Sequence, residues 1–222
     1  TETLTPTQVE RSSSSASFIS KTFFDDTEYP TVTIGGHKWM AKNLNYYKGE
    51  LENPSYYMSC RGSSNTDLKL CNNDGGGDGI YYDYNSAARI AAIGASFKNA
   101  QTDLAWTLPS ESDAKALLAA VGNEALHLWS PNMGGTKGGT NQSGFYVLNS
   151  GYHEYIGAVY QYHDPKYEQK VETCFWLWSG TNPTSPKALC FYPDNNTSLY
   201  EIAPRPKENL YPIRLIYGDV KE

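Results

Sequence analysis

The chain has 222 residues, of which 39% are hydrophobic and 19% charged, and its formal net charge is −6. The excess of acidic groups argues against a surface that binds nucleic acid or an anionic membrane, so we expect no nucleic-acid partner. No apolar run approaches the roughly 18 residues that a membrane-spanning helix needs, so we predict no such segment. With 18 tyrosines and 19 glycines, the core is expected to combine aromatic side chains with many loops.

Residues 1–29 are polar and begin with TETLTPTQVERSSSSAS, a serine- and threonine-rich stretch without a hydrophobic period. This composition is typical of a flexible linker. We predict a linker or stalk over residues 1–29, suited to joining a cell-surface anchor to a folded head. The folded domain is expected over residues 30–222.

Order is predicted to begin with TVTIGGHKWMAKNL, residues 31–44. Val32 and Ile34 alternate with threonines, which is the pattern of a half-buried strand. The adjacent Gly35 and Gly36 accept the positive φ that a tight two-residue turn needs. We therefore predict a β-hairpin here.

A first helix is predicted within DYNSAARIAAIGASFKNA, residues 83–100. Small apolar side chains recur there at helical spacing, which leaves one apolar face. Asn85 or Ser86 can cap its N-terminus.

A second helix is predicted within LPSESDAKALLAAVG, residues 108–122. Ser110 and Asp113 have the spacing of a capping box, with aspartate in place of glutamate. The buried stripe of this helix and its stop signal are expected at Ala114, Leu117, Leu118, Val121 and Gly122.

After residue 122 the pattern changes to loops and short strands. NMGGTKGGTNQSG, residues 132–144, is interpreted as a glycine-rich loop. Strand character is found in residues 145–163, with a turn near 156–158, and in 174–181, 188–193, 198–202 and 211–218. Two helices followed by many short strands predict an α+β fold, with the helices packed beside small antiparallel sheets.

Four cysteines occur as two local pairs, Cys60 with Cys71 and Cys174 with Cys190. Neither pair has the spacing of a zinc site. In an acidic chain rich in tyrosine, glycine and asparagine we interpret them as two disulfides, although four cysteines permit three connectivities. Disulfides would place the protein outside the cytosol, and the alternative is four reduced thiols in a cytosolic protein.

The stretch CNNDGGGDGIYYDYNSAARI resembles the start of an EF-hand calcium loop, with acidic residues at Asp74 and Asp78. Counting from Asp74, the third position is Gly76 and the twelfth is Asn85, so a hard cation would lose two of its ligands. We keep Asp74 and Asp78 as candidate calcium ligands and interpret the loop first as an acidic turn. No other cofactor is expected.

A second metal option lies at His153-Glu154 and His163-Asp164, which flank the turn of the last predicted hairpin. If the two histidines approached one another across the strands, they would offer nitrogens and carboxylates to a metal ion. The pairing register decides this. Exposed histidines on an ordinary hairpin are the alternative.

Aromatic side chains in loop- and hairpin-rich regions are the remaining functional signal, because such rings stack on sugars and anchor protein partners. The candidate ligand-binding residues are Trp129, Tyr155, Tyr160 and Tyr162, and the alternative is that they belong to the core. Neither a G-x-S-x-G nucleophile motif nor a phosphate-binding loop is present. We predict no enzymatic activity.

Seven features in order resemble one family: TIGGHKWMAKNL, a cysteine pair, GIYYDYNSA, WTLPSESDAKAL, SGFYVLNSGY, WLWSGT and PIRLIY. Over residues 31–217 the chain is similar to the Fibrobacter succinogenes major paralogous domain, which occurs in exported and surface proteins of Fibrobacteres and Bacteroidetes. The resemblance implies a C-type-lectin-like fold and matches Cys60 and Cys71 to the family's first cysteine pair. Further positions that match the family's fold include Trp39, Trp106, Gly144, Trp178 and Arg214.

The chain departs from this family at the second cysteine pair. Leu215 stands where the family often has a cysteine, and Cys174 and Cys190 appear instead. The calcium motifs with which true C-type lectins bind sugar are missing, so the resemblance does not imply calcium-dependent binding. Formylglycine-generating enzymes share the general fold, but their C-terminal catalytic cysteine motif has no match after Arg214.

The resemblance and the composition together predict a non-enzymatic recognition or adhesion module, exported to the bacterial cell surface. It would bind a glycan or a surface protein through its loops, for example within a fimbria or as a surface lipoprotein. Two alternatives stay open. One is an accessory enzyme of the formylglycine-generating or glycan-processing kind, and the other is a purely structural surface domain.

Overall fold

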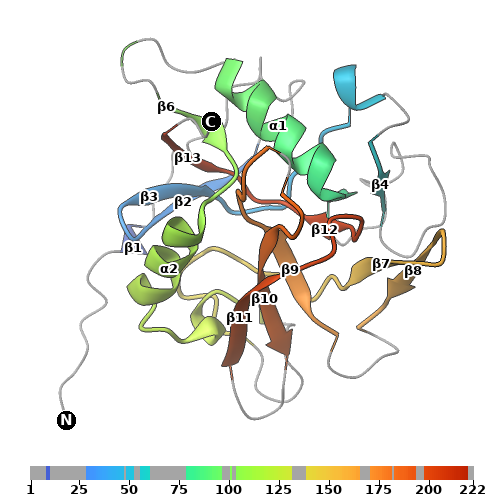
Figure 1. Cartoon of the computed structure of the whole chain (residues 1–222). Helices are drawn as coiled ribbons and strands as arrows, with labels where there is room; N and C mark the ends of the chain where they lie inside the picture. The colour runs from blue at the N-terminus through green and yellow to red at the C-terminus, as the bar shows by residue number, and fades with distance from the viewer. Residues whose placement is uncertain are drawn as a thin grey trace.

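A computed structural model shows how these elements assemble (Figure 1). It describes residues 9–10, 29–47, 49–52, 56–60, 79–96, 101, 104–131, 139–165, 171–181, 183–193 and 198–219. These residues form two α-helices and several small antiparallel sheets, so the predicted α+β class is confirmed. None of the described helices is both long enough and apolar enough to cross a membrane.

Five strands form the largest described sheet, in the order β1-β2-β3-β13-β6. Their bounds, in that order, are Val9–Glu10, Thr31–Ile34, His37–Met40, Ile216–Asp219 and Leu104–Thr107. The predicted hairpin is confirmed as β2 and β3, because Gly35 and Gly36 have φ of 61° and 81° and close the turn between them. Strand β1 falls within the predicted linker and pairs with the edge of β2, so the sheet includes two residues of that segment.

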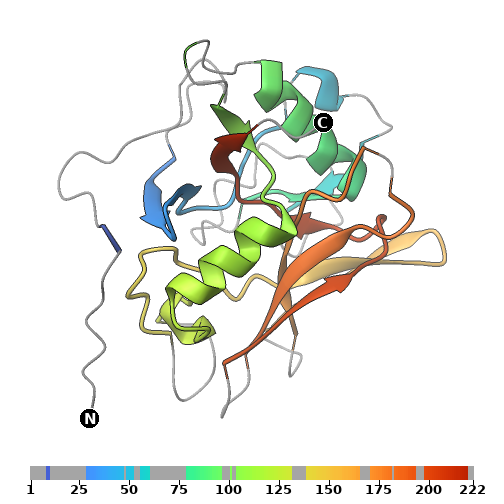
Figure 2. The same ribbon diagram turned by 60° about the vertical axis from the view of Figure 1, so that its left-hand side comes forward.

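Helix α2, Glu111–Ala120, lies between this sheet and the strands that follow it (Figure 2). The predicted capping box is confirmed. The Ser110 hydroxyl accepts the Asp113 amide at 3.2 Å, and the Asp113 carboxylate accepts the Ser110 amide at 2.7 Å. The apolar stripe of α2 is buried in one cluster with side chains from β2 and β3 on one side and from β9 and β10, defined below, on the other.

Helix α1, Tyr84–Ser96, is capped by Asp83. The Asp83 carboxylate accepts the backbone amide of Ser86 at 2.8 Å and also the Ser86 hydroxyl. The prediction that Asn85 or Ser86 caps this helix is therefore wrong, because the helix begins at Tyr84 and the cap is the residue before it. The Asp83 backbone amide also donates to the carbonyl of Tyr57, a residue of the candidate site described below.

A three-stranded sheet, β11-β10-β9, separates the two hydrophobic clusters of the protein. Its strands are Ser198–Pro204, Lys187–Pro193 and Thr173–Trp176. One face carries Trp176 into the cluster with α1, and the opposite face carries Phe175 into the cluster with α2. This alternation follows from the two-residue period of a strand and buries both faces of β9 and of the middle of β10, whereas β11 at the edge is partly exposed.

Cys174 and Cys190 are direct partners across β9 and β10, with Cα atoms 4.0 Å apart, and they form the predicted disulfide. Both are completely buried. Cys60 is disulfide-bonded as well. Its predicted partner, Cys71, lies outside the described residues.

The prediction of one continuous strand over residues 211–218 is wrong, because the chain forms two short strands there that belong to different sheets. Tyr211–Pro212 forms β12, and β13 begins only at Ile216. Between them Arg214 is buried and donates to Asn43 Oδ1 at 2.8 Å and to the carbonyls of Phe145 and Tyr146. Burial lowers the pKa of this guanidinium to about 9.

The remaining elements are short. Strand β12 joins β5, Tyr81–Tyr82, and β4, Met58–Ser59, in a small sheet with the order β12-β5-β4. Strands β7, Tyr152–Ile156, and β8, Val159–His163, form a separate hairpin. Single-turn helices occur at Gly49–Glu52 and Ala125–His127.

Candidate ligand-binding surface

The hairpin β7–β8 projects from the body of the protein (Figure 1). It confirms the turn predicted near residues 156–158, because Ile156 pairs with Val159 and two residues remain between them. Gly157 and Ala158 have φ of 55° and 74°. A two-residue turn that matches the twist of its strands needs positive φ at both positions, and at Ala158 the Cβ makes this conformation costly.

The base of the hairpin is fastened to the body at His153. Its backbone amide donates to Leu210 at 3.1 Å, and the Leu210 amide donates back at 2.8 Å. The imidazole Nε2 lies 3.1 Å from the Cys60 carbonyl, and the ring contacts Tyr81 edge-on. Burial, with a smaller contribution from the charge of His163, lowers the pKa of His153 to about 4.

Three tyrosines form a continuous row on one face of the hairpin, which we call the tyrosine row: Tyr57, Tyr155 and Tyr160. Tyr160 lies in the middle, with ring centroids 5.1 Å from Tyr155 and 5.8 Å from Tyr57. Tyr155 and Tyr160 are direct cross-strand partners, and Tyr57 precedes β4. The outer two rings are exposed, whereas Tyr160 is half-buried.

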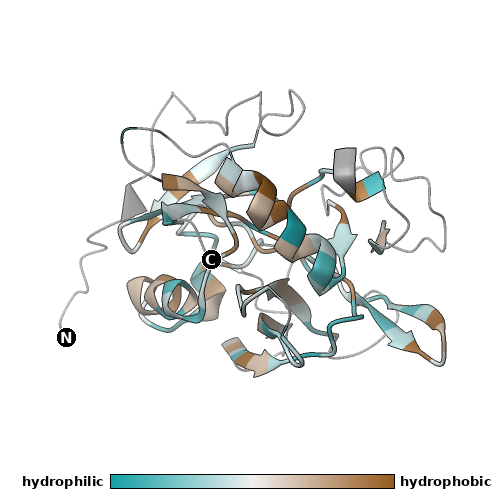
Figure 3. Ribbon diagram, turned by 45° about the horizontal axis from the view of Figure 1, so that its top comes forward, coloured by the Kyte–Doolittle hydropathy of each residue, from teal (hydrophilic) through white to brown (hydrophobic). Residues whose placement is uncertain are grey.

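The opposite face of the hairpin ends in two aliphatic side chains, Ile156 and Val159, which we call the aliphatic tip. They are 48% and 64% exposed. Figure 3 shows hydrophobic residues at the end of the hairpin. The tip therefore presents apolar side chains on both of its faces.

Two carboxylates accompany the tyrosine row. The Asp83 amide donates to the Tyr57 carbonyl at 3.0 Å, and Glu208 precedes Asn209, whose side chain accepts the Tyr155 amide at 3.2 Å. Burial raises the pKa of Asp83 to about 6. Burial raises the pKa of the Tyr160 phenol too, and the negative charges of Asp83 and Glu208 add to this shift.

The sequence-predicted site residues fall into four groups. Tyr155 and Tyr160 lie in the tyrosine row, as described. Trp129 is completely buried in the cluster around α2, so the prediction that it contributes to a binding surface is wrong in this structure. Tyr162 is half-buried and donates to the Ser150 carbonyl at 2.8 Å, which turns it toward the body. The candidate calcium ligands Asp74 and Asp78 lie outside the described residues.

The predicted histidine metal site is wrong, because the register places the two histidines on opposite faces of the hairpin. His163 is the partner of Tyr152, and His153 is the partner of Tyr162. His163 Nε2 lies 3.0 Å from a Glu154 carboxylate oxygen, while His153 faces the body. A pairing shifted by one residue would be needed to bring both rings to one face.

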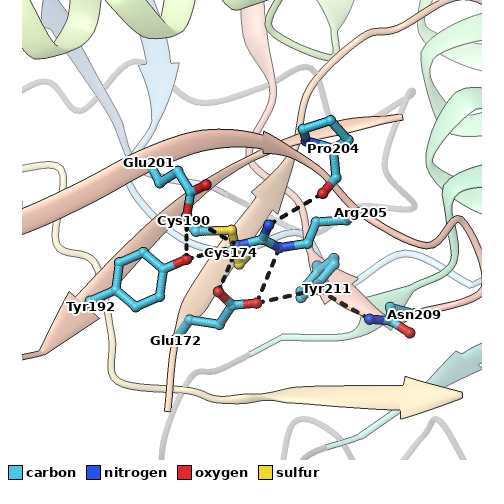
Figure 4. The surroundings of a disulfide bond; sticks show 9 residues. All are labelled: Glu172, Cys174, Cys190, Tyr192, Glu201, Pro204, Arg205, Asn209 and Tyr211. Carbon is cyan, nitrogen blue, oxygen red and sulfur yellow. Dashed lines mark hydrogen bonds and ion pairs between the residues drawn. A yellow bond between two sulfur atoms is a disulfide. The ribbon is translucent and has the colours of Figure 1, made fainter. Parts of the chain in front are cut away.

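A second polar cluster surrounds the Cys174–Cys190 disulfide (Figure 4). Arg205 donates to both carboxylate oxygens of Glu172, at 3.2 and 2.8 Å, and to the Tyr192 hydroxyl at 2.8 Å. Ligand atoms of Glu172 and the two cysteines lie within 4.8 Å of one another. The sulfurs are joined in a disulfide and offer no thiolate to a metal, so this cluster is a structural clasp.

Tyr57, Asp83 and Glu208 are the residues of the surface that sequence reasoning missed. They come from three segments that meet the hairpin only in the folded chain, and none lies in a recognisable motif. Comparisons of the chain with protein-family models, with curated proteins and with solved structures find no match. The surface therefore has to be interpreted from its own chemistry.

Proposed function

We propose that this protein is a non-enzymatic recognition or adhesion module of the bacterial cell surface, which binds a glycan or a protein at the tyrosine row. The observation that carries the proposal is the exposure of the hairpin tip, where Tyr155, Ile156 and Val159 are 42%, 48% and 64% exposed. Large apolar side chains gathered on a projecting element are typical of interaction sites. Their exposure contributes nothing to the stability of the fold.

We further propose a C-type-lectin-like fold for the domain. It is supported by the resemblance of residues 31–217, by two helices packed beside short antiparallel sheets, and by the pairing of β13 with β3, which brings the two ends of the domain together. The disulfides at Cys174–Cys190 and at Cys60 support an exported location, because disulfides persist in oxidising compartments.

The proposal is tested by binding of the labelled protein to a glycan array and to intact bacterial cells. We expect binding that is lost in the double variant Tyr57→Ala/Tyr155→Ala and kept in Tyr146→Ala, a control tyrosine that is 37% exposed outside the hairpin. A chelator arm tests the calcium option at Asp74 and Asp78. Binding by the double variant at the wild-type level, or no binding by the wild type to any surface, would contradict the proposal.

A further inference from the structure

We infer that the tyrosine row binds a positively charged side chain, above all the guanidinium of arginine, on a partner protein. This inference rests on the proposed function and narrows its ligand from a glycan or a protein to a basic protein segment. It follows from the ring geometry, from the signs of the neighbouring charges and from the aliphatic tip, which are taken in turn.

The rings of the tyrosine row are tilted against one another and are not stacked face to face. Tyr160 is inclined to Tyr155 by 50° and to Tyr57 by 47°, so neither neighbour lies flat on it. The outer rings are 52% exposed at Tyr57 and 42% exposed at Tyr155. The face of an aromatic ring carries the negative part of its quadrupole and attracts a cation placed over it.

The charges beside the row have the sign that a cation requires. Glu208 is exposed, and Asp83 is held next to Tyr57 by the hydrogen bond from its backbone amide to the Tyr57 carbonyl, while its carboxylate accepts the Ser86 amide. Both carboxylates act on the Tyr160 hydroxyl. Because Asp83 is buried and already accepts hydrogen bonds, it cannot readily accept one from a sugar, whereas its field attracts a cation without direct contact.

The aliphatic tip favours a protein over a small amine. Ile156 and Val159 lie beyond the row at the end of the same hairpin and expose aliphatic area that a free amine would leave uncovered. The row and the tip lie on opposite faces of the hairpin, so a protein segment that places a basic side chain on the row and continues around the turn can lay an apolar side chain on the tip, which a small amine cannot do. Arginine is preferred to lysine because its planar guanidinium stacks on aromatic faces.

The test compares two blocked hexapeptides of alternating residues, one of arginine and leucine and one of citrulline and leucine, which have the same shape and differ in charge. Binding is measured by fluorescence anisotropy at low and at high ionic strength. We expect the arginine peptide to bind at least about tenfold more tightly at low salt, because citrulline has neither the cation–π nor the ionic attraction. High salt is expected to narrow this difference.

Variants separate the contributions. Tyr57→Leu and Tyr155→Leu keep apolar area but remove the ring, and each is expected to weaken arginine-peptide binding about two- to fivefold, while the corresponding Tyr→Phe variants bind as the wild type does. Glu208→Gln is expected to weaken it about two- to fivefold, and Lys207→Gln, which removes the adjacent cation, to strengthen it. Tyr146→Leu is the matched control and is expected to change nothing.

Three outcomes would overturn the inference: equal binding of the two peptides, unchanged binding in both Tyr→Leu variants, or glycan binding that depends on Tyr57 and Tyr155 while neither peptide binds. In the last case the proposed function stands and only the ligand class is wrong. If the protein binds neither the peptides nor glycans nor cells, both the inference and the proposed function fail. Thermal unfolding of each variant shows that a loss of binding is not a loss of fold.

Discussion

The hairpin β7–β8 and the sheet β9–β10–β11 are both antiparallel, yet they differ in where their apolar side chains lie. In the sheet, residues on both faces of β9 and of the middle of β10 are buried between two hydrophobic clusters, and a disulfide joins β9 to β10. The hairpin is fastened at its base through His153, and its tip carries Tyr155, Ile156 and Val159 into solvent. Buried apolar residues stabilise the fold in the sheet, whereas the exposed apolar residues of the hairpin tip contribute little to its stability.

This difference separates positions that stability constrains from positions that it does not. A substitution in the sheet creates a cavity or breaks a clasp, whereas a substitution at the hairpin tip changes what the surface can bind. If the tip were merely a poorly packed part of the core, the same substitutions would destabilise the protein. Measurements of unfolding therefore test the functional interpretation as well as the fold.

Removing the Cys174–Cys190 disulfide is expected to have the largest effect. The bond closes a loop with a sequence separation of 16, so Cys174→Ala/Cys190→Ala should lower the free energy of unfolding by about 3 kcal/mol. Urea unfolding monitored by tryptophan fluorescence measures this. The matched variant in the other region, Ile156→Ala/Val159→Ala, should cost less than about 0.5 kcal/mol. Equal losses in the two variants would erase the distinction between the regions.

The attachment of the hairpin is expected to depend on pH, unlike the covalent bond in the sheet. His153 has its pKa lowered to about 4, so the unfolded chain binds more protons than the folded one between pH 4 and 6.5, and its contribution to stability falls as pH falls. Asp83 has its pKa raised from 3.8 to about 6, so its contribution falls as pH rises. Each contribution amounts to about 3 kcal/mol, and between pH 4 and 6 they oppose one another.

Two single variants separate these opposed contributions. Asp83→Asn should reveal the histidine alone, with stability decreasing from pH 6.5 to 4, and His153→Gln should reveal the aspartate, with the opposite slope. The double variant gives the slope of all other groups. Urea unfolding at a series of pH values checks the signs, and parallel slopes in the two single variants would show that these groups do not titrate as described.

The clasp over the disulfide is expected to contribute less than the disulfide itself. Arg205 and Glu172 have side chains that are 16% and 14% exposed, so they are screened more than a fully buried pair. Arg205→Met should cost about 1–2 kcal/mol, because it leaves the Glu172 carboxylate without its cation. The double variant Arg205→Met/Glu172→Gln should recover part of this loss in urea unfolding. This account would be contradicted if the double variant lost more unfolding free energy than the two single variants lose together.

Local signals in the sequence predict local structure, whereas contacts between segments distant in the chain could not be predicted from it. The Gly35-Gly36 turn and the Ser110–Asp113 capping box need only their own neighbours, and both were predicted. The prediction that Trp129 lies on the surface is wrong because an aromatic residue in an irregular segment has no hydrophobic period that would indicate its burial. Likewise nothing near Tyr57 indicates that it meets Tyr160, because more than a hundred positions separate the two in the chain.

The smallest expected effect lies in the turn of the hairpin itself. Ala158 has φ of 74°, where a Cβ is unfavourable, and it is exposed, so Ala158→Gly should stabilise the protein by about 0.5–1 kcal/mol. Its neighbour provides the control. A Cβ added at Gly157 would meet no atom within 4 Å, but the residue has a φ of 55°, which is unfavourable for alanine. Gly157→Ala should therefore destabilise the hairpin by a similar amount. Thermal unfolding detects both shifts, and a gain at position 158 with unchanged peptide binding would show that the tip's strain is separable from its recognition surface.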